Sequence, residues 1–176
     1  NAQRLTLVVE SEKALAVASV AAADLNFPEA QRIVLIPANA KPWLVALATV
    51  YAARNGVPLM FTATDKLTYA VKQDLVRRKA THAYLVGPEN QVSPKVLSTL
   101  KSIGLKTPLR VGGSPSALVQ AIYPRTDHSP AVYVDFKASI KTVLQAVSFA
   151  TATGWPLLDL NKKVASSTIG MIKYFN

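Results

Sequence analysis

The sequence predicts an α/β protein made of tandem small modules, with mainly parallel sheets flanked by helices. Short apolar and β-branched runs alternate with longer amphipathic stretches along the chain. The run at 33–36, Ile-Val-Leu-Ile, is apolar at every position, as in strands that are covered on both faces. Connections of helix length between such strands imply parallel pairing through right-handed crossovers. We therefore expect sheets with helices on both sides.

Seven runs are predicted as strands, and the segments between them as helices. The strands are expected at 5–9, 32–37, 57–62, 83–87, 109–111, 131–134 and 156–160. Asn39 and Pro42 are expected to open one helix, which Asn55-Gly56 closes. Apolar side chains recur in this helix at spacings of three and four and predict a buried stripe: Trp43, Leu44, Leu47, Val50 and Tyr51. Trp43 is thus interpreted as a core residue rather than an exposed platform for a ligand.

An internal repeat organises the chain. Gly56-Val57-Pro58-Leu59 returns as Gly154-Trp155-Pro156-Leu157, an offset of 154 − 56 = 98 residues. The same offset places 34–36 on 132–134 without a gap. One unit therefore starts near Leu5 and a second near Leu109, which predicts a first α/β repeat at 1–108 and a second, incomplete repeat at 109–176. The incomplete repeat must leave an open sheet edge or dock elsewhere.

The amino-acid composition excludes several classes of protein and of functional site. The chain has 176 residues, of which 50% are hydrophobic and 17% charged, and this excludes a disordered chain or two large domains. Cysteine is absent, which excludes disulfides, cysteine-ligated zinc and a thiol nucleophile. No apolar run reaches the roughly 18 residues that a membrane span needs. Twenty basic residues against ten acidic ones give a net charge of +10, which predicts attraction to polyanions.

The basic residues are concentrated in the middle of the chain, where 32–125 holds 13 of them against three acidic residues. The candidate contacts with a polyanion are Lys41, Arg54, Lys72, Arg77, Arg78 and Lys79. A solvated helix face is an equally good interpretation of the cluster at 77–79, because cations are favourable at a helix C-terminus without any ligand.

Four short motifs stand in a recognisable order. They are Pro58-Leu59-Met60-Phe61-Thr62, Val86-Gly87-Pro88, Val92-Ser93 and Val111-Gly112-Gly113. In this order and spacing the chain resembles the type 2 cell-wall-binding repeat of Gram-positive surface proteins. The resemblance covers almost the whole chain, as one full unit and about two thirds of another.

The resemblance implies a toprim-like fold with flavodoxin-like layering and a module without catalytic activity, enzyme cofactor or metal. It further implies an extracellular location, where such modules, usually three in a row, anchor an attached domain to anionic polymers of the cell wall. The basic surplus of this chain is consistent with that partner.

Candidate catalytic groups are sparse. A toprim metal site needs a Glu after the first strand and an Asp-x-Asp after a later one. Glu10 has the first position, but no Asp-x-Asp occurs, so Glu10 is interpreted as a carboxylate at a helix N-terminus. His82 and His128 have no metal-ligand neighbour at helical spacing, and no Gly-x-Ser-x-Gly elbow occurs. The glycine turn at 111–116 is interpreted as an ordinary strand-to-helix connection.

Two alternatives to a wall-binding module remain open. One is a structural module that assembles a surface layer or an oligomer, such as a trimer, with the charge serving only solubility. The other, less favoured, is a toprim-type nucleic-acid-binding protein or Mg²⁺-dependent enzyme. Nucleic acid is the less favoured partner because the chain does not interleave aromatic residues with arginine.

Overall fold

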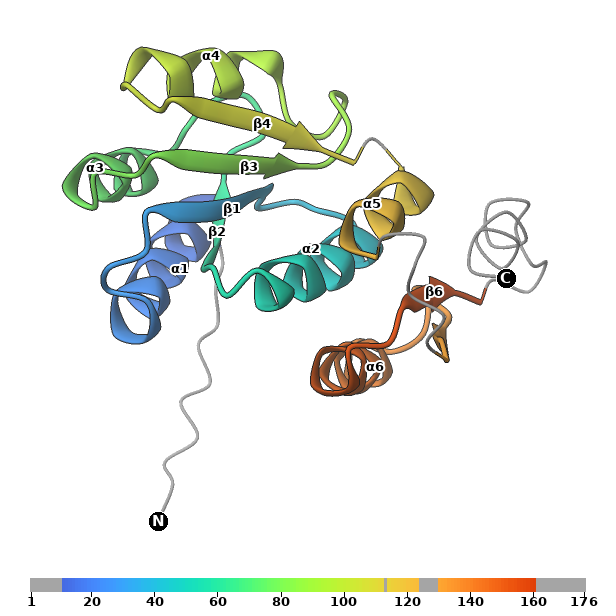
Figure 1. Ribbon diagram of the computed structural model, residues 1–176. Helices are drawn as coiled ribbons and strands as arrows, with labels where there is room; N and C mark the ends of the chain where they lie inside the picture. The colour runs from blue at the N-terminus through green and yellow to red at the C-terminus, as the bar shows by residue number, and fades with distance from the viewer. Residues whose placement is uncertain (1–10, 113, 124–129, 161–176) are drawn as a thin grey trace.

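The computed structural model describes residues 11–112, 114–123 and 130–160 (Figure 1). The helices are α1 (Glu12–Asn26), α2 (Pro42–Arg54), α3 (Tyr69–Arg77), α4 (Pro94–Ser102), α5 (Pro115–Ile122) and α6 (Ile140–Thr153). The strands are β1 (Arg32–Pro37), β2 (Leu59–Thr62), β3 (His82–Val86), β4 (Thr107–Val111), β5 (Val132–Val134) and β6 (Leu157–Asp159). The strand expected at 5–9 lies outside the described residues.

Four strands form one parallel sheet in the order β2-β1-β3-β4. Side chains of β1 point alternately to the two faces of this sheet. Ile33 and Leu35 belong to one core, under α1, α3 and α4. Val34 and Ile36 belong to the other core, with α2 and α5. The prediction of an α/β fold with helices on both sides of a parallel sheet is confirmed.

The start of α2 differs from the expectation. The N-cap is Lys41, which gives no side-chain hydrogen bond, and Pro42 is the first helical residue. Asn39 does not cap the helix, because its Oδ1 accepts a hydrogen bond from Thr64 Oγ1 at 3.0 Å. The predicted end of the helix is confirmed, since Asn55 is its C-cap and Gly56 follows with a φ of 60°.

The smaller sheet repeats the pairing of the larger one. β1 and β2 pair with Val34 opposite Leu59, and β5 and β6 pair with Val132 opposite Leu157. Both partners are displaced by the same offset, since 34 + 98 = 132 and 59 + 98 = 157. The unit β5-α6-β6 therefore has the strand register of β1-α2-β2.

β4 crosses the predicted boundary between the repeats. It runs from Thr107 to Val111 and pairs with β3, so the strand expected to open the second repeat belongs to the first sheet. The division at 108 passes through this strand. The division into repeats at 1–108 and 109–176 stays a prediction.

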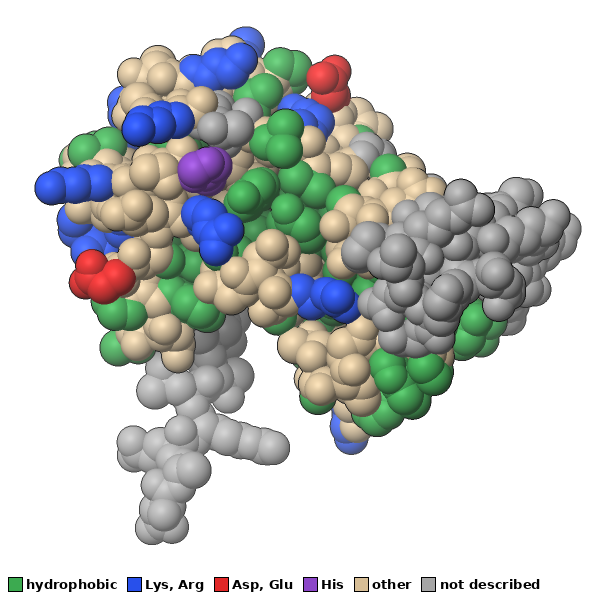
Figure 2. Space-filling model, in the orientation of Figure 1, with side chains coloured by type: hydrophobic (Ala, Val, Ile, Leu, Met, Phe, Trp, Pro, Cys, Tyr) green, Lys and Arg blue, Asp and Glu red, His purple; other side chains and the backbone are tan. Residues whose placement is uncertain are grey.

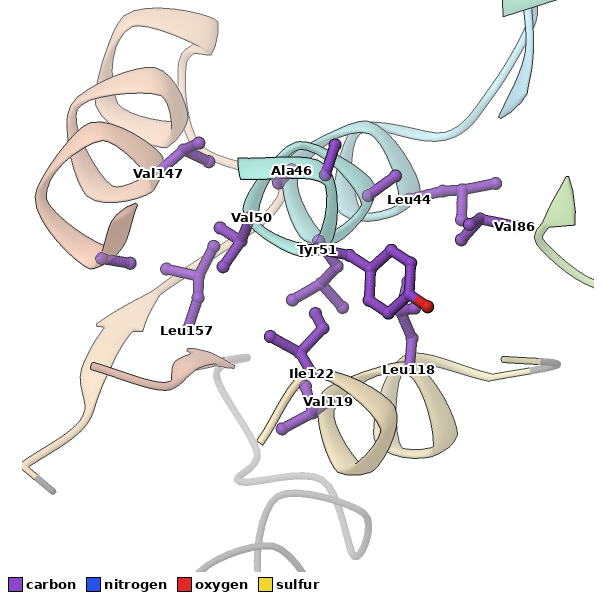
Figure 3. Packing of buried hydrophobic residues seen from close by; sticks show 14 of the residues in the cluster. Leu44, Ala46, Val50, Tyr51, Val86, Leu118, Val119, Ile122, Val147 and Leu157 are labelled. Carbon is purple, nitrogen blue, oxygen red and sulfur yellow. The ribbon is translucent and has the colours of Figure 1, made fainter. Parts of the chain in front are cut away.

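The two sheets share one core, which is centred on α2 (Figure 3). Leu44 faces Val86 of the large sheet, and Val50 lies on the side of α2 that faces Leu157 and Val147 (Figure 3). Both α5 and α6 pack on α2. Most of this helix is buried: Leu44, Ala46, Leu47, Ala48, Val50, Tyr51 and Ala52. The unit β5-α6-β6 is therefore docked on the large sheet through the packing of α6 against α2.

Candidate polyanion-binding surface

The six residues predicted to contact a polyanion lie on both faces of the large sheet. Lys72 and Arg77 are in α3, and Arg78 and Lys79 follow it directly. Lys41 and Arg54 lie at opposite ends of α2, about 20 Å apart at 1.5 Å per residue. Since α3 and α2 belong to different cores, the structure does not bring all six residues into one patch.

Arg78 is a buried structural residue. Its side chain is 0% exposed, and its Nε donates to Asp74 Oδ2 at 2.7 Å. Its Nη2 bonds Asp24 Oδ1 of α1, and its Nη1 donates to the carbonyl oxygens of Phe27 and Pro28. The guanidinium thus ties the end of α3 to the end of α1. The Arg78 side chain is therefore not accessible to a polyanion.

Arg77 and Arg54 are accessible in part but are engaged within the fold. Arg77, 55% exposed, bridges Asp24 and Asp74, and its hydrogen bond with Asp74 raises its pKa. Arg54 Nη1 donates to the carbonyl oxygen of Gly154 at 2.9 Å, and its guanidinium lies 4.6 Å from the centre of the Tyr123 ring. Arg54 therefore links the end of α2 to the end of α6.

Lys41, Lys72 and Lys79 are the exposed members of the set, and none of them forms an ion pair with another described residue. Figure 2 shows Lys and Arg side chains spread over the part of the molecule formed by α3 and α4, with few acidic side chains between them. Positive charge therefore outweighs negative charge over this part of the surface.

A pocket of about 660 Å³ lies between the start of α1 and the loop that leads from β2 into α3. Three exposed lysines line it, Lys13, Lys66 and Lys72, together with the carboxylate of Glu12. Tyr69 lies at this pocket with 76% of its surface exposed. The three lysines outnumber the acidic group, so an anion would be attracted to the pocket.

The N-terminus of α3 also lines this pocket. Thr68 is its N-cap but gives no side-chain cap, and the buried Thr68 Oγ1 has no hydrogen-bond partner within the described ranges. The uncapped end of a helix carries partial positive charge that favours an anion. Sequence analysis missed Lys13 here, because Lys13 and Lys72 meet only through the packing of α1 beside α3.

Of the residues considered for catalysis, Glu10, His82 and His128, the structure describes only His82. Glu10, Asp127 and His128 lie outside the described residues. His82 Nδ1 is 2.9 Å from Thr81 Oγ1. In the glycine turn at 111–116, Ser114 Oγ accepts from Ala117 N and so caps α5. Within 11–112, 114–123 and 130–160 no group of three or more His, Asp or Glu side chains could hold a metal ion.

The chain is similar to three proteins of known name. N-acetylmuramoyl-L-alanine amidase LytC of Bacillus subtilis (strain 168) is 27% identical over 137 residues, which cover 72% of this chain and 26% of LytC. Cwp6 from Clostridium difficile superimposes with a TM-score of 0.71 at 20% identity, over 93% of this chain and 26% of that chain. Cwp8 from the same organism gives 0.72 at 18% identity, over 94% and 29%.

These similarities establish the fold. The chain spans between a quarter and a third of the length of each of the three proteins. No family model matches the sequence. In the part of the chain that the structure describes, no helix is long and apolar enough to cross a membrane.

Proposed function

We propose that the chain is a non-catalytic, cell-surface module of the type 2 cell-wall-binding kind, with toprim-like layering, that binds an anionic cell-wall glycopolymer. The observation that carries this proposal is the pocket lined by Lys13, Lys66 and Lys72 beside the uncapped start of α3. A net charge of +10 adds long-range attraction to a polyanion.

The similar proteins support the cell wall as the location of the partner. Cwp6 and Cwp8 are cell wall proteins, and LytC is named as an amidase that acts on an N-acetylmuramoyl compound. The match covers only 26% of LytC, so its activity is not assigned to this chain. An extracellular module that holds an attached domain at the wall agrees with both kinds of neighbour.

A polymer would be held by several weak contacts. Each exposed lysine near an anionic surface contributes about 1 kcal/mol, and contacts along one chain add by multivalency. Lys41, Lys79 and the pocket lysines lie on different elements, which suits a flexible chain that passes over the surface rather than a small ligand held in one place. Binding through such contacts weakens as salt screens the charges.

A triple variant, Lys13→Gln with Lys66→Gln and Lys72→Gln, tests the pocket. At about 1 kcal/mol for each lysine we expect affinity for isolated wall glycopolymer to fall about a hundredfold and to depend less on salt. The control, Lys95→Gln with Lys101→Gln and Lys106→Gln, removes the same charge from exposed sites of α4 and the turn after it. Equal losses in both variants would show that net charge alone attracts the polymer.

A groove between α2 and α6 favours a second candidate function, assembly of an oligomer or surface layer. Equivalent positions of the two repeats line it, Pro42 with Ile140, Val45 with Val143 and Ala46 with Leu144. Ile140 and Leu144 are 66% and 53% exposed. A second copy of the chain, which presents the same apolar residues of α2 and α6, is the occupant that matches this groove. A solution mass above 18.9 kDa that Leu144→Glu reduces would establish this function.

A further inference from the structure

A second pocket, of about 470 Å³, lies at the junction of the two repeats. One side is the start of α2, from Lys41 to Trp43, which follows the connection from β1. The other side is the loop that follows β5, from Phe136 to Ala138, with Asp159 at the end of β6. Ligands of parallel α/β folds bind outside the carboxyl ends of the strands, and this pocket lies at the carboxyl ends of β5 and β6, beside the helix that follows β1. The volume is within the range of small-molecule sites.

Two cations face this pocket from different repeats. Lys41 and Lys137 both line it, both are exposed, and neither forms an ion pair with a described residue. The start of α2 carries no side-chain cap, so its partial positive charge adds to theirs. Asp159 lies on the same side of the pocket as Lys137, and its Oδ1 already accepts a hydrogen bond from Phe136 N. A negatively charged ligand matches the two cations and the start of α2.

Aromatic side chains give the pocket an apolar wall. Trp43, which was predicted to be a core residue, is only half-buried: it packs at the margin of the core and also lines the pocket. Phe136 is 7% exposed and lines it as well. Rigid aromatic rings provide a large contact area at low entropic cost, and a pyranose ring offers a C–H face that packs on them.

The loop that presents Lys137 is held in place by hydrogen bonds. Asp135 Oδ1 accepts from Lys137 N at 2.8 Å, and the Asp135 carbonyl oxygen accepts from Ala138 N at 2.9 Å. Asp159 Oδ1 accepts from Phe136 N at 3.4 Å, which ties this loop to β6. A site ordered before the ligand arrives loses less entropy on binding.

We propose that this pocket binds one anionic sugar residue, with its pyranose face on Trp43 and its carboxylate or phosphate between Lys41 and Lys137. The assignment rests on the proposed function, because the sugar would be one unit of the wall polymer. It adds to that function a site with selectivity for a sugar, whereas exposed lysines alone select only for charge.

Tryptophan fluorescence reports on the site directly. The chain has two tryptophans, and Trp155→Phe keeps an aromatic ring near Phe149 and leaves Trp43 as the reporter. In this background we expect glucuronic acid or glucose 6-phosphate to change the Trp43 emission saturably, with a Kd in the range of about 1 mM. Glucose and inorganic phosphate should give a response at least about tenfold weaker, because each supplies only one of the two kinds of contact.

Matched variants decide the roles of the lysines. Lys41→Gln with Lys137→Gln should weaken binding of the acidic sugar about tenfold or more, while Lys101→Gln with Lys106→Gln should leave it unchanged. Circular dichroism checks that each variant is folded. No saturable response to either acidic sugar, or an equal response to inorganic phosphate, would overturn the assignment.

Binding to whole walls separates this assignment from the proposed function. If the chain binds walls but Trp43 does not respond to acidic sugars, the pocket assignment is wrong and the proposed function stands. If Trp43 responds saturably but the chain does not bind walls, the pocket assignment stands and the proposed function is wrong.

Discussion

Arg78→Ala should lower the free energy of unfolding by about 3 to 5 kcal/mol, because it removes the buried partner of the Asp74 carboxylate, which keeps only its ion pair with the half-exposed Arg77. Asp74 is 2% exposed at its side chain and receives the Arg78 Nε hydrogen bond at 2.7 Å. The carbonyl oxygens of Phe27 and Pro28 lose the hydrogen bonds from Arg78 at the same time, and that of Phe27 keeps its bond from Ala30 N. At about 2 to 4 °C for each kcal/mol in a chain of this size, the Tm should fall by roughly 6 to 20 °C.

The neighbouring residue supplies the control. Arg77→Ala removes an identical side chain that is 55% exposed and leaves the Arg78–Asp74 pair intact. We expect a much smaller loss, since exposed ion pairs contribute little to stability. Urea unfolding of both variants, followed by circular dichroism, measures the difference. Similar losses for the two variants would contradict the role assigned to Arg78.

Val50→Asp should destabilise the protein by about 4 kcal/mol or more, because it places an unpaired carboxylate in the core that the two sheets share. Val50 is 0% exposed and lies on the side of α2 that faces α6 and β6 (Figure 3). Since α2 also packs on the large sheet, the whole described fold should lose stability in one transition.

Ala53→Asp is the matched control for this variant, because Ala53 is exposed on the same helix. It should cost about 1 kcal/mol or less, mainly through an acidic group near a helix C-terminus. Calorimetry distinguishes a single unfolding transition from two separate ones. Two separate transitions in Val50→Asp, with only the weaker one shifted, would mean that the two sheets have independent cores.

Short sequence patterns predicted the strands and helix ends that depend on neighbouring residues in the chain. The apolar run at 33–36 is a strand buried on both faces, and Asn55-Gly56 ends α2 where a positive φ is required. The offset of 98 residues reappears in the strand register, where the paired residues are equally far apart in both units, since 59 − 34 = 25 and 157 − 132 = 25.

Short sequence patterns could not predict contacts between residues that are far apart in the chain. The run at 109–111 reads equally well as the first strand of a new sheet or as the edge of the previous one, and only its packing beside β3 decides. Lys41 and Lys137 are 137 − 41 = 96 residues apart, so no local spacing could indicate the pocket that they share.

Arg77 and Arg78 show that a sequence pattern does not reveal which of two adjacent charged residues is buried. Composition counts Arg77 and Arg78 as equal charges, yet one is half-exposed and the other is buried. Asp74, four residues before Arg78, was the available sequence signal for a helical ion pair. The contribution of Asp24 could not be found in this way, because it comes from α1.

Cosedimentation of the chain with Gram-positive cell walls tests the central claim most directly. Intact walls, the same walls stripped of glycopolymer, and duplex DNA would be compared across a salt series with and without Mg²⁺. We expect the chain to bind intact walls, with an affinity that weakens as salt rises and does not depend on Mg²⁺. We expect little binding to stripped walls. Equal binding to stripped walls, or stronger binding to DNA than to intact walls, would contradict it.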